Sequence, residues 1–161
     1  MKTAIYPGSF DPITLGHLNV IRRASFIFDK VIVCVMVNSS KNTMFTLEER
    51  MDHIQRVVGR FGNVHVDMFS GLLAEYAKKY ESAVIVKGLR AISDFEYEFQ
   101  MAMINKKINP NLDTMFLTAS EKYTYLSSTV VREMAHHGAD IKEFVPYEII
   151  EDVVNKSKYG R

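Results

Sequence analysis

Residues 6–17 read Tyr-Pro-Gly-Ser-Phe-Asp-Pro-Ile-Thr-Leu-Gly-His and connect a short apolar segment to an amphipathic one. The apolar segment, Thr3 to Tyr6, predicts a buried strand. The Pro-Gly and Asp-Pro pairs that follow are turn signals, which favour an end to regular strand pairing. From residue 18 to residue 28 apolar side chains recur at helical spacing, so we expect a helix that begins near Thr14, a good N-cap residue. The stretch therefore predicts a strand, a loop and a helix.

The beginning of this helix has the properties of an anion site. Unpaired backbone N–H groups and the positive end of the helix dipole meet there, and both attract phosphate. Gly8 and Gly16 lack a Cβ, so a ligand can approach the main chain closely, and His17 adds a side-chain donor. The alternative is an ordinary strand-to-helix loop with a surface histidine. We interpret the run as a site for the phosphates of a nucleotide.

Composition favours one compact domain that spans residues 1–161, because 47% of the residues are hydrophobic and 24% are charged. A net charge of +1 argues against a nucleic-acid partner, since no overall basic field is present. The single cysteine, Cys34, lies in an apolar run, which indicates a buried thiol and a reducing compartment. No apolar run reaches the ~20 residues that cross a bilayer. The sequence thus predicts a cytoplasmic protein without a membrane span.

The rest of the chain alternates between predicted strands and predicted helices. Apolar, β-branched runs predict strands at residues 31–37, 64–68, 83–86 and 114–117. Helical spacing and capping signals, among them the boxes Thr46–Glu49 and Ser93–Glu96, predict helices at residues 46–58, 72–80, 93–108, 127–137 and 146–154. Pro146 suits the first position of the last helix. This alternation predicts an α/β fold, a doubly wound parallel sheet of five strands.

Residues suited to phosphate binding follow four of the five predicted strands. In such sheets ligands bind at the carboxyl ends of the strands, so loops that follow different strands meet at one edge. A single lysine such as Lys41 would by itself be interpreted as a solvated surface charge. Four loops that converge favour a site instead. The residues concerned are Ser9, His17, Lys41, Lys87, Arg90 and 127–129.

The run from Pro7 to His17 resembles the Thr/His-x-Gly-His signature of the nucleotidyltransferase superfamily, and specifically the bacterial phosphopantetheine adenylyltransferase family. Further segments are similar to motifs of that family, from Ala4 to past Arg132: Ser40-Lys-Asn, Lys87-Gly-Leu-Arg90, Asp94-Phe-Glu-Tyr-Glu98 and Leu126-Ser-Ser-Thr-Val-Val-Arg132. The resemblance implies a Rossmann-like nucleotidyltransferase fold. Departures from the pattern are Ser9 for Thr, Lys87 for Arg and Gly71 for an acidic residue.

The resemblance also implies roles for individual residues. It makes His17, Lys41 and Arg90 catalytic. It assigns the binding of 4'-phosphopantetheine to Ser9, Lys41, Leu73 and Lys87. The residues that it assigns to ATP are Gly8, Ser9, Phe10, His17, Gly88, Leu89, Arg90, Glu98, Tyr123, Thr124, Tyr125, Leu126, Ser127, Ser128 and Thr129.

The implied reaction is attack by the phosphate of 4'-phosphopantetheine on the α-phosphorus of ATP, which yields dephospho-coenzyme A and pyrophosphate. We expect one direct in-line displacement, because the acceptor brings its own nucleophile and Cys34 is predicted to be buried. Mg²⁺ is expected on the ATP phosphates and not in a protein metal site, since the adjacent His136 and His137 cannot share one helix face. The resemblance further implies a homohexamer and raises the question of feedback binding by the product or by coenzyme A.

Three alternatives stay open at this point. The chain could be another nucleotidyltransferase, acting on nicotinate mononucleotide or glycerol phosphate. It could be a non-catalytic nucleotide-binding module, although His17 together with Lys41 disfavours that. It could bind RNA, which the charge balance disfavours.

Overall fold

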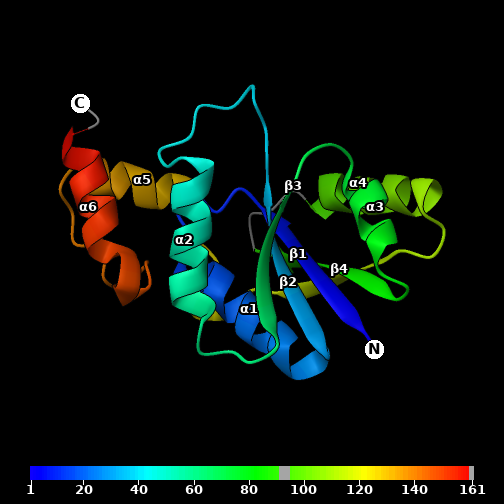
Figure 1. Cartoon of the computed structure of the whole chain (residues 1–161). Helices are drawn as coiled ribbons and strands as arrows, with labels where there is room; N and C mark the ends of the chain where they lie inside the picture. Colours follow the sequence, from blue (N-terminus) through cyan, green and yellow to red (C-terminus); the bar gives the residue numbers. More distant parts are fainter. Residues whose placement is uncertain (91–94, 160–161) are drawn as a thin grey trace.

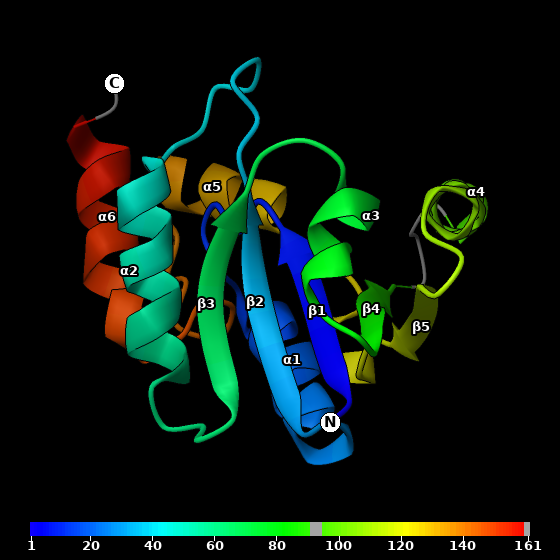
Figure 2. The ribbon, with the colours of Figure 1, turned by 45° about the vertical axis from the view of Figure 1, so that its right-hand side comes forward.

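The computed structural model describes residues 1–90 and 95–159 and contains one sheet of five parallel strands in the order β3-β2-β1-β4-β5. All four neighbouring pairs are parallel, so every strand ends at the same edge of the sheet. Figure 2 shows β1, β2 and β3 ending at the top of the view. The predicted fold class is therefore confirmed. The strands are β1 (Thr3–Gly8), β2 (Lys30–Met36), β3 (Val64–Phe69), β4 (Ala83–Leu89) and β5 (Asp113–Thr118).

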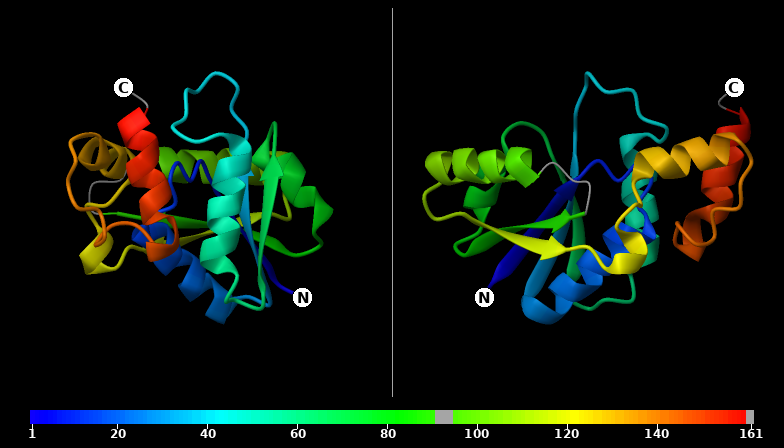
Figure 3. Two further views of the ribbon diagram at one scale, coloured as in Figure 1. Left: turned by 60° about the vertical axis from the view of Figure 1, so that its left-hand side comes forward. Right: turned by 180° about the vertical axis from the view of Figure 1, so that it is seen from behind.

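Helices cover both faces of the sheet (Figure 1). α1, α2, α5 and α6 contribute to the core on one face, and α3 packs on the other, where α4 runs beside β5. Figure 3 shows the same arrangement from the side and from behind. The α-helices are α1 (Leu15–Ile27), α2 (Leu47–Val58), α3 (Leu73–Tyr76), α4 (Phe95–Ile108), α5 (Ser128–His136) and α6 (Ile150–Tyr159), and the 3-10 turns are η1 (Ala77–Lys79), η2 (Glu121–Tyr123) and η3 (Tyr147–Ile149).

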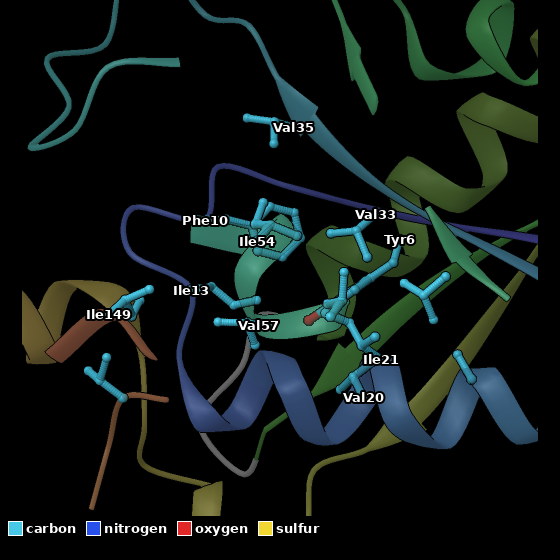
Figure 4. Packing of buried hydrophobic residues seen from close by; sticks show 14 of the residues in the cluster. Tyr6, Phe10, Ile13, Val20, Ile21, Val33, Val35, Ile54, Val57 and Ile149 are labelled. Carbon is cyan, nitrogen blue, oxygen red and sulfur yellow. The ribbon is translucent and has the colours of Figure 1, made fainter. Parts of the chain in front are cut away.

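The core has two layers because side chains alternate along each central strand. On β1, Ala4 and Tyr6 face the larger cluster, whereas Ile5 faces the smaller one. Figure 4 shows the larger cluster, in which side chains of α1 and α2 pack against the sheet. Both faces of β1 and β2 are thus buried, as the apolar runs predicted.

β1 and β4 extend well beyond their predicted ends. Pro7 and Gly8 were expected to end β1, yet they pair with Cys34 and Val35 of β2. Proline is tolerated here because β1 pairs with β4 only through Thr3–Ile5, so at Pro7 one side of the strand has no ladder to interrupt. Residues 87–89 likewise continue β4 by pairing with β5. The turn residues were therefore misinterpreted at both positions, because they mark where β1 and β4 separate.

The predicted helix starts are largely confirmed. Thr14 caps α1, Thr46 and Glu49 form the expected capping box of α2, and Ser127 caps α5. Ser93 and Asp94, which belong to the predicted start of α4, lie outside the described residues. Pro146 precedes η3 instead of opening the last helix directly. None of the helices in the described part of the chain is both long and apolar enough to cross a membrane.

Candidate active site

A cavity of about 220 Å³ lies where β1 and β4 separate at the carboxyl edge of the sheet. It occupies the point at which the strand order reverses direction, between the half β3-β2-β1 and the half β4-β5. Its walls come from the two strands, from the start of α1 and from the segment that leads into α5. The lining residues are Tyr6, Pro7, Thr14, Gly16, His17, Val20, Lys87, Gly88, Arg90, Glu98, Ala119, Tyr123, Leu126, Ser127 and Ser128.

His17 is built into the cap of α1. The Thr14 hydroxyl accepts a hydrogen bond from the His17 N–H at 3.3 Å, and the Thr14 N–H donates to His17 Nδ1 at 2.9 Å. This is a reciprocal capping box with histidine in the third helical position. Because Nδ1 accepts a hydrogen bond from a backbone N–H, it carries no proton, and Nε2 carries the hydrogen of the neutral ring. His17 therefore presents a donor of fixed tautomer.

The surroundings of His17 keep its ring neutral. Burial, together with the smaller effect of the nearby Arg90 charge, lowers the pKa of His17 to about 4. The ring makes edge contacts with Phe10, whose centroid is 5.0 Å away, and Phe10 in turn contacts Tyr6. A neutral imidazole held by aromatic neighbours can donate one hydrogen bond to an incoming phosphate without rotating away.

Gly8 has a different role from the predicted one. We expected it to admit a ligand to the main chain, but a Cβ at Gly8 would lie only 3.0 Å from Cζ of Phe10. Phe10 is buried and has a positive φ of 48°, which is uncommon for a residue with a side chain. The missing Cβ therefore makes room for the ring that supports His17.

Two cations of the cavity already have partners from other elements. Arg90 donates from Nη1 to the carbonyl oxygen of Leu126 at 2.8 Å, which joins the end of β4 to the segment before α5. Lys87 Nζ lies 3.6 Å from Glu98 Oε2 of α4. Each pair thus connects a sheet strand to a wall of the cavity. Lys87, Gly88 and Arg90 all line the cavity, where cationic groups and backbone N–H groups can bind phosphate oxygens.

The start of α5 adds a second helix N-terminus to the same edge. Ser127 Oγ accepts from the Val130 N–H at 3.2 Å and so acts as the N-cap. Ser128 Oγ donates to the carbonyl oxygen of Pro12 at 2.7 Å, which ties α5 to the loop after β1. Thr129 does not line the cavity and instead accepts from Arg132 Nη2. The hydroxyl groups of all three residues therefore form hydrogen bonds within the protein.

The structure brings together about half of the predicted site residues. Nine line the cavity: His17, Lys87, Gly88, Arg90, Glu98, Tyr123, Leu126, Ser127 and Ser128. The others lie outside its lining: Gly8, Ser9, Phe10, Lys41, Leu73, Leu89, Thr124, Tyr125 and Thr129. Within this second set, Lys41 Nζ lies 3.4 Å from Ser9 Oγ, so these two form a separate pair beside the cavity, and Leu73 packs against the smaller core.

Sequence reasoning missed two buried charged residues beside the site. Asp11 accepts backbone hydrogen bonds from Met44 and Phe45, and Arg50 Nη1 donates to the carbonyl oxygen of Ser9 at 2.9 Å. The signal for Arg50 was present, because it occupies the apolar stripe of α2 where a charge needs a partner. Asp11 was taken only as a turn residue, and its sequence context does not identify its partners.

No group of three or more His, Cys, Asp and Glu side chains within residues 1–90 and 95–159 is arranged to hold a metal ion. Among the described residues that line the cavity, Glu98 is the one carboxylate, and it is paired with Lys87. The cavity therefore offers cations and N–H donors to a polyanion.

Comparison with known proteins gives the class first. Residues 5–134 match the family described as cytidylyltransferase-like, so the chain belongs to the nucleotidyltransferase class. A solved structure from Vibrio parahaemolyticus, described as a nicotinate-nucleotide adenylyltransferase, covers 96% of this chain and 100% of its own with a TM-score of 0.69. Its sequence identity of 23% supports the shared fold alone.

Curated relatives give the particular family. Phosphopantetheine adenylyltransferase of Clostridium botulinum strain Hall is 54% identical over 161 residues, which cover 100% of this chain and 98% of the relative. The protein of the same name from Caldanaerobacter subterraneus is 51% identical over 158 residues, covering 98% and 99%. The chain belongs to the phosphopantetheine adenylyltransferase family.

The geometry of His17 makes a testable prediction about its pKa. In ligand-free protein we expect the imidazole to titrate with a pKa of about 4 in an NMR titration, because burial and Arg90 both oppose the imidazolium. His17→Gln, which removes the resonance, assigns the signal. ATP should raise the value, since its phosphates favour the protonated ring. A ligand-free pKa at or above 6.5, the ordinary value, would contradict the described environment.

The lowered pKa of His17 also makes the free energy of unfolding depend on pH. The folded pKa of His17 lies below its unfolded value, so this contribution to the free energy of unfolding is complete above pH 6.5 and is lost as the pH falls towards 4. Urea unfolding of the wild type and of His17→Gln at both ends of that range measures it. The wild type should lose more stability than the variant on acidification.

Proposed function

We propose that the chain transfers the adenylyl group of ATP to 4'-phosphopantetheine and releases pyrophosphate, which yields dephospho-coenzyme A for coenzyme A biosynthesis. One observation carries the proposal: in a chain of this family, a cavity at the separation of β1 and β4 joins a histidine-capped helix start to Arg90 and the start of α5. This arrangement is suited to a triphosphate, because donors and positive charge approach it from several elements.

We propose that ATP occupies this cavity. Its phosphates lie at the helix start capped by Thr14, with Arg90 as a planar cationic donor. The Nε2–H of neutral His17 donates to an oxygen of the α-phosphate. As the new bond forms, negative charge grows on the oxygens of that phosphate, and a donor already in place stabilises it without reorganisation. Gly88, Glu98 and the residues from Tyr123 to Thr129 are the further ATP residues of the proposal, with Gly8, Ser9, Phe10 and Leu89.

We assign the acceptor to the pair beside the cavity. Lys41 and Ser9 lie 3.4 Å apart and can bind the phosphate of 4'-phosphopantetheine together, with Lys87 on the side of β4. Leu73 at the start of α3 offers an apolar contact for the pantetheine arm. Cationic groups at this position offset the repulsion between two polyanions. Dephospho-coenzyme A and coenzyme A contain the same pantetheine phosphate, so both would compete for the acceptor site.

Mg²⁺ enters this proposal with the ATP. A cation bound to the phosphates neutralises part of their charge and needs few protein ligands. The cavity fits such a metal, because the one carboxylate that the described part of the chain contributes to its lining, Glu98, is already paired with Lys87. In this proposal the ATP phosphates bind the Mg²⁺, and we assign no protein residue as its ligand. We further propose that residues 1–161 act as one domain in the cytoplasm, consistent with the buried, unpaired thiol of Cys34.

We propose one in-line displacement without a covalent enzyme intermediate. The acceptor phosphate is an oxygen nucleophile that needs no base near neutral pH. Cys34 is fully buried in β2 and burial raises the pKa of its thiol to about 11, so it cannot serve as a nucleophile. With ATP that is chirally labelled at the α-phosphorus we expect inversion. Net retention would mean two displacements and would make His17 a nucleophile instead of a donor.

The activity and the role of His17 are tested in one assay of pyrophosphate release from ATP and 4'-phosphopantetheine, with each substrate omitted in turn as a blank. His17→Ala should lower kcat by roughly 10²- to 10³-fold, as for the loss of one preorganised donor, while the Kd of ATP changes much less. His65→Ala is the matched control, because His65 is exposed on β3. An unchanged kcat with an equal loss in ATP affinity would refute the assignment.

We also propose that the chain assembles with copies of itself into a homohexamer. The supporting observation is α4, which has no buried residue in the single chain. A stable helix normally buries much of its apolar surface, and in α4 several large apolar side chains stay exposed. The exposed apolar side chains of α4 are Phe95, Tyr97, Phe99, Met103 and Ile104.

The assembly is tested by sedimentation. We expect the wild type to run at several times the chain mass of 18.5 kDa. Met103→Glu places a charge on the proposed contact and should reduce the mass, because burying an unpaired carboxylate is costly. Tyr147→Glu, at an aromatic residue that is 78% exposed in η3, serves as the control and should leave the mass unchanged. A wild type that stays monomeric would reject the proposal.

A further inference from the structure

Asp11 is a charged residue in the interior beside the site. It is only 3% exposed, and both carboxylate oxygens accept backbone hydrogen bonds from the loop that follows β2. Oδ2 accepts from the Met44 N–H at 2.8 Å, and Oδ1 accepts from the Phe45 N–H at 2.9 Å. Hydrogen bonds to an ionised acceptor are stronger than neutral ones. Asp11 therefore clamps the far end of the loop that carries Lys41.

Arg132 of α5 fixes Asp11 from the opposite side. Its Nη1 lies 3.7 Å from Asp11 Oδ2 and donates to the Asp11 carbonyl oxygen at 2.6 Å. The buried carboxylate thus has a cationic partner as well as two N–H donors, which offsets the cost of its burial. Through Asp11 the loop after β1, the loop after β2 and helix α5 are held in one arrangement.

The clamp acts close to Lys41. Only two residues separate Lys41 from Met44, so fixing the main chain at Met44 limits where Lys41 can lie. The Lys41 side chain is long and exposed, with Nζ 3.4 Å from Ser9 Oγ. Ordering such a side chain costs conformational entropy, and a main chain that is already fixed reduces the volume that it must search.

We propose that Asp11 is a positioning residue, which holds the loop of residues 38–46 so that Lys41 meets the acceptor phosphate. The inference rests on the proposed function, because it gives Lys41 its substrate. Asp11 touches no substrate in this scheme and acts through Lys41. The alternative is that Asp11 only stabilises the fold, and the experiments below separate the two.

The first experiment uses Asp11→Asn. The variant keeps the size of the side chain, but its amide NH₂ group faces a backbone N–H where an oxygen accepted before, so the clamp is broken on one side. We expect kcat/KM for 4'-phosphopantetheine to fall roughly tenfold or more, since small misplacements of a reacting group are costly. The Kd of ATP should change much less, because the bond from Arg132 to the Asp11 carbonyl oxygen remains.

A double-mutant cycle tests whether Asp11 acts through Lys41. In a Lys41→Ala background we expect Asp11→Asn to lower kcat/KM by no more than about twofold, because the side chain to be positioned is gone. If the losses of the two single variants multiply fully, Asp11 works independently of Lys41 and the proposal is wrong.

Limited trypsin digestion tests the loop without any substrate. Cleavage after Lys41, identified by mass spectrometry well below the unfolding midpoint, should be roughly tenfold faster in Asp11→Asn, since proteolysis follows local opening. Leu112→Ala is the stability control. It removes a side chain that is 2% exposed in the smaller core and is expected to cost about 2–5 kcal/mol, yet it should leave cleavage after Lys41 at the wild-type rate.

The activity assay and the trypsin digestion distinguish a failure of the proposed function from a failure of the positioning role. If the wild type releases no pyrophosphate with 4'-phosphopantetheine, the proposed function fails, while digestion still tests the clamp. If Asp11→Asn is cleaved after Lys41 no faster than the wild type, or if Leu112→Ala is cleaved just as fast, the positioning role is overturned.

Discussion

The site depends on a limit to strand pairing between β1 and β4. The two strands pair through Thr3–Ile5 and Ala83–Ile85 and then separate, while each keeps its other neighbour. The separation leaves a cavity in the middle of an otherwise continuous sheet, where strand ends and helix starts supply donors that have no ladder to join. Gly88 allows β4 to lie close to α1 beside this cavity, because a Cβ on residue 88 would lie only 3.1 Å from the Val20 side chain of α1. The architecture therefore determines the position of the site before any catalytic side chain is considered.

Much of this could be predicted from sequence because the signals are local. The alternation of apolar runs and caps predicts five parallel strands, and Thr14, Thr46 and Ser127 cap the helices that they were expected to cap. What failed was the interpretation of Pro7 and of the residues after Val86 as strand ends. Turn propensity is a local property, whereas the number of neighbours that a strand has at a given residue is set by tertiary structure.

The site itself was predictable in outline but not in its supports. Residue type and position identified His17 and Arg90, yet the tautomer of His17 follows from the Thr14 N–H, and the partner of Arg90 is a carbonyl group 36 residues away. Asp11 and Arg50 hold main-chain atoms of distant loops, at separations of 33 and 41 residues. Hydrogen bonds to main-chain atoms carry no side-chain signature in the partner. Sequence reasoning from motifs therefore finds reacting groups more readily than the residues that hold them.

One residue that lines the cavity comes from a helix that is itself poorly buried. Glu98 reaches Lys87 from α4, the helix without a buried residue of its own. If a second copy packs against the exposed apolar residues of α4, the wall of the cavity that Glu98 forms is held in place by assembly of the chains and not by folding of one chain alone. The fraction of competent sites would then rise with the amount of protein in the cell, so that expression level would affect turnover per chain as well as the number of chains.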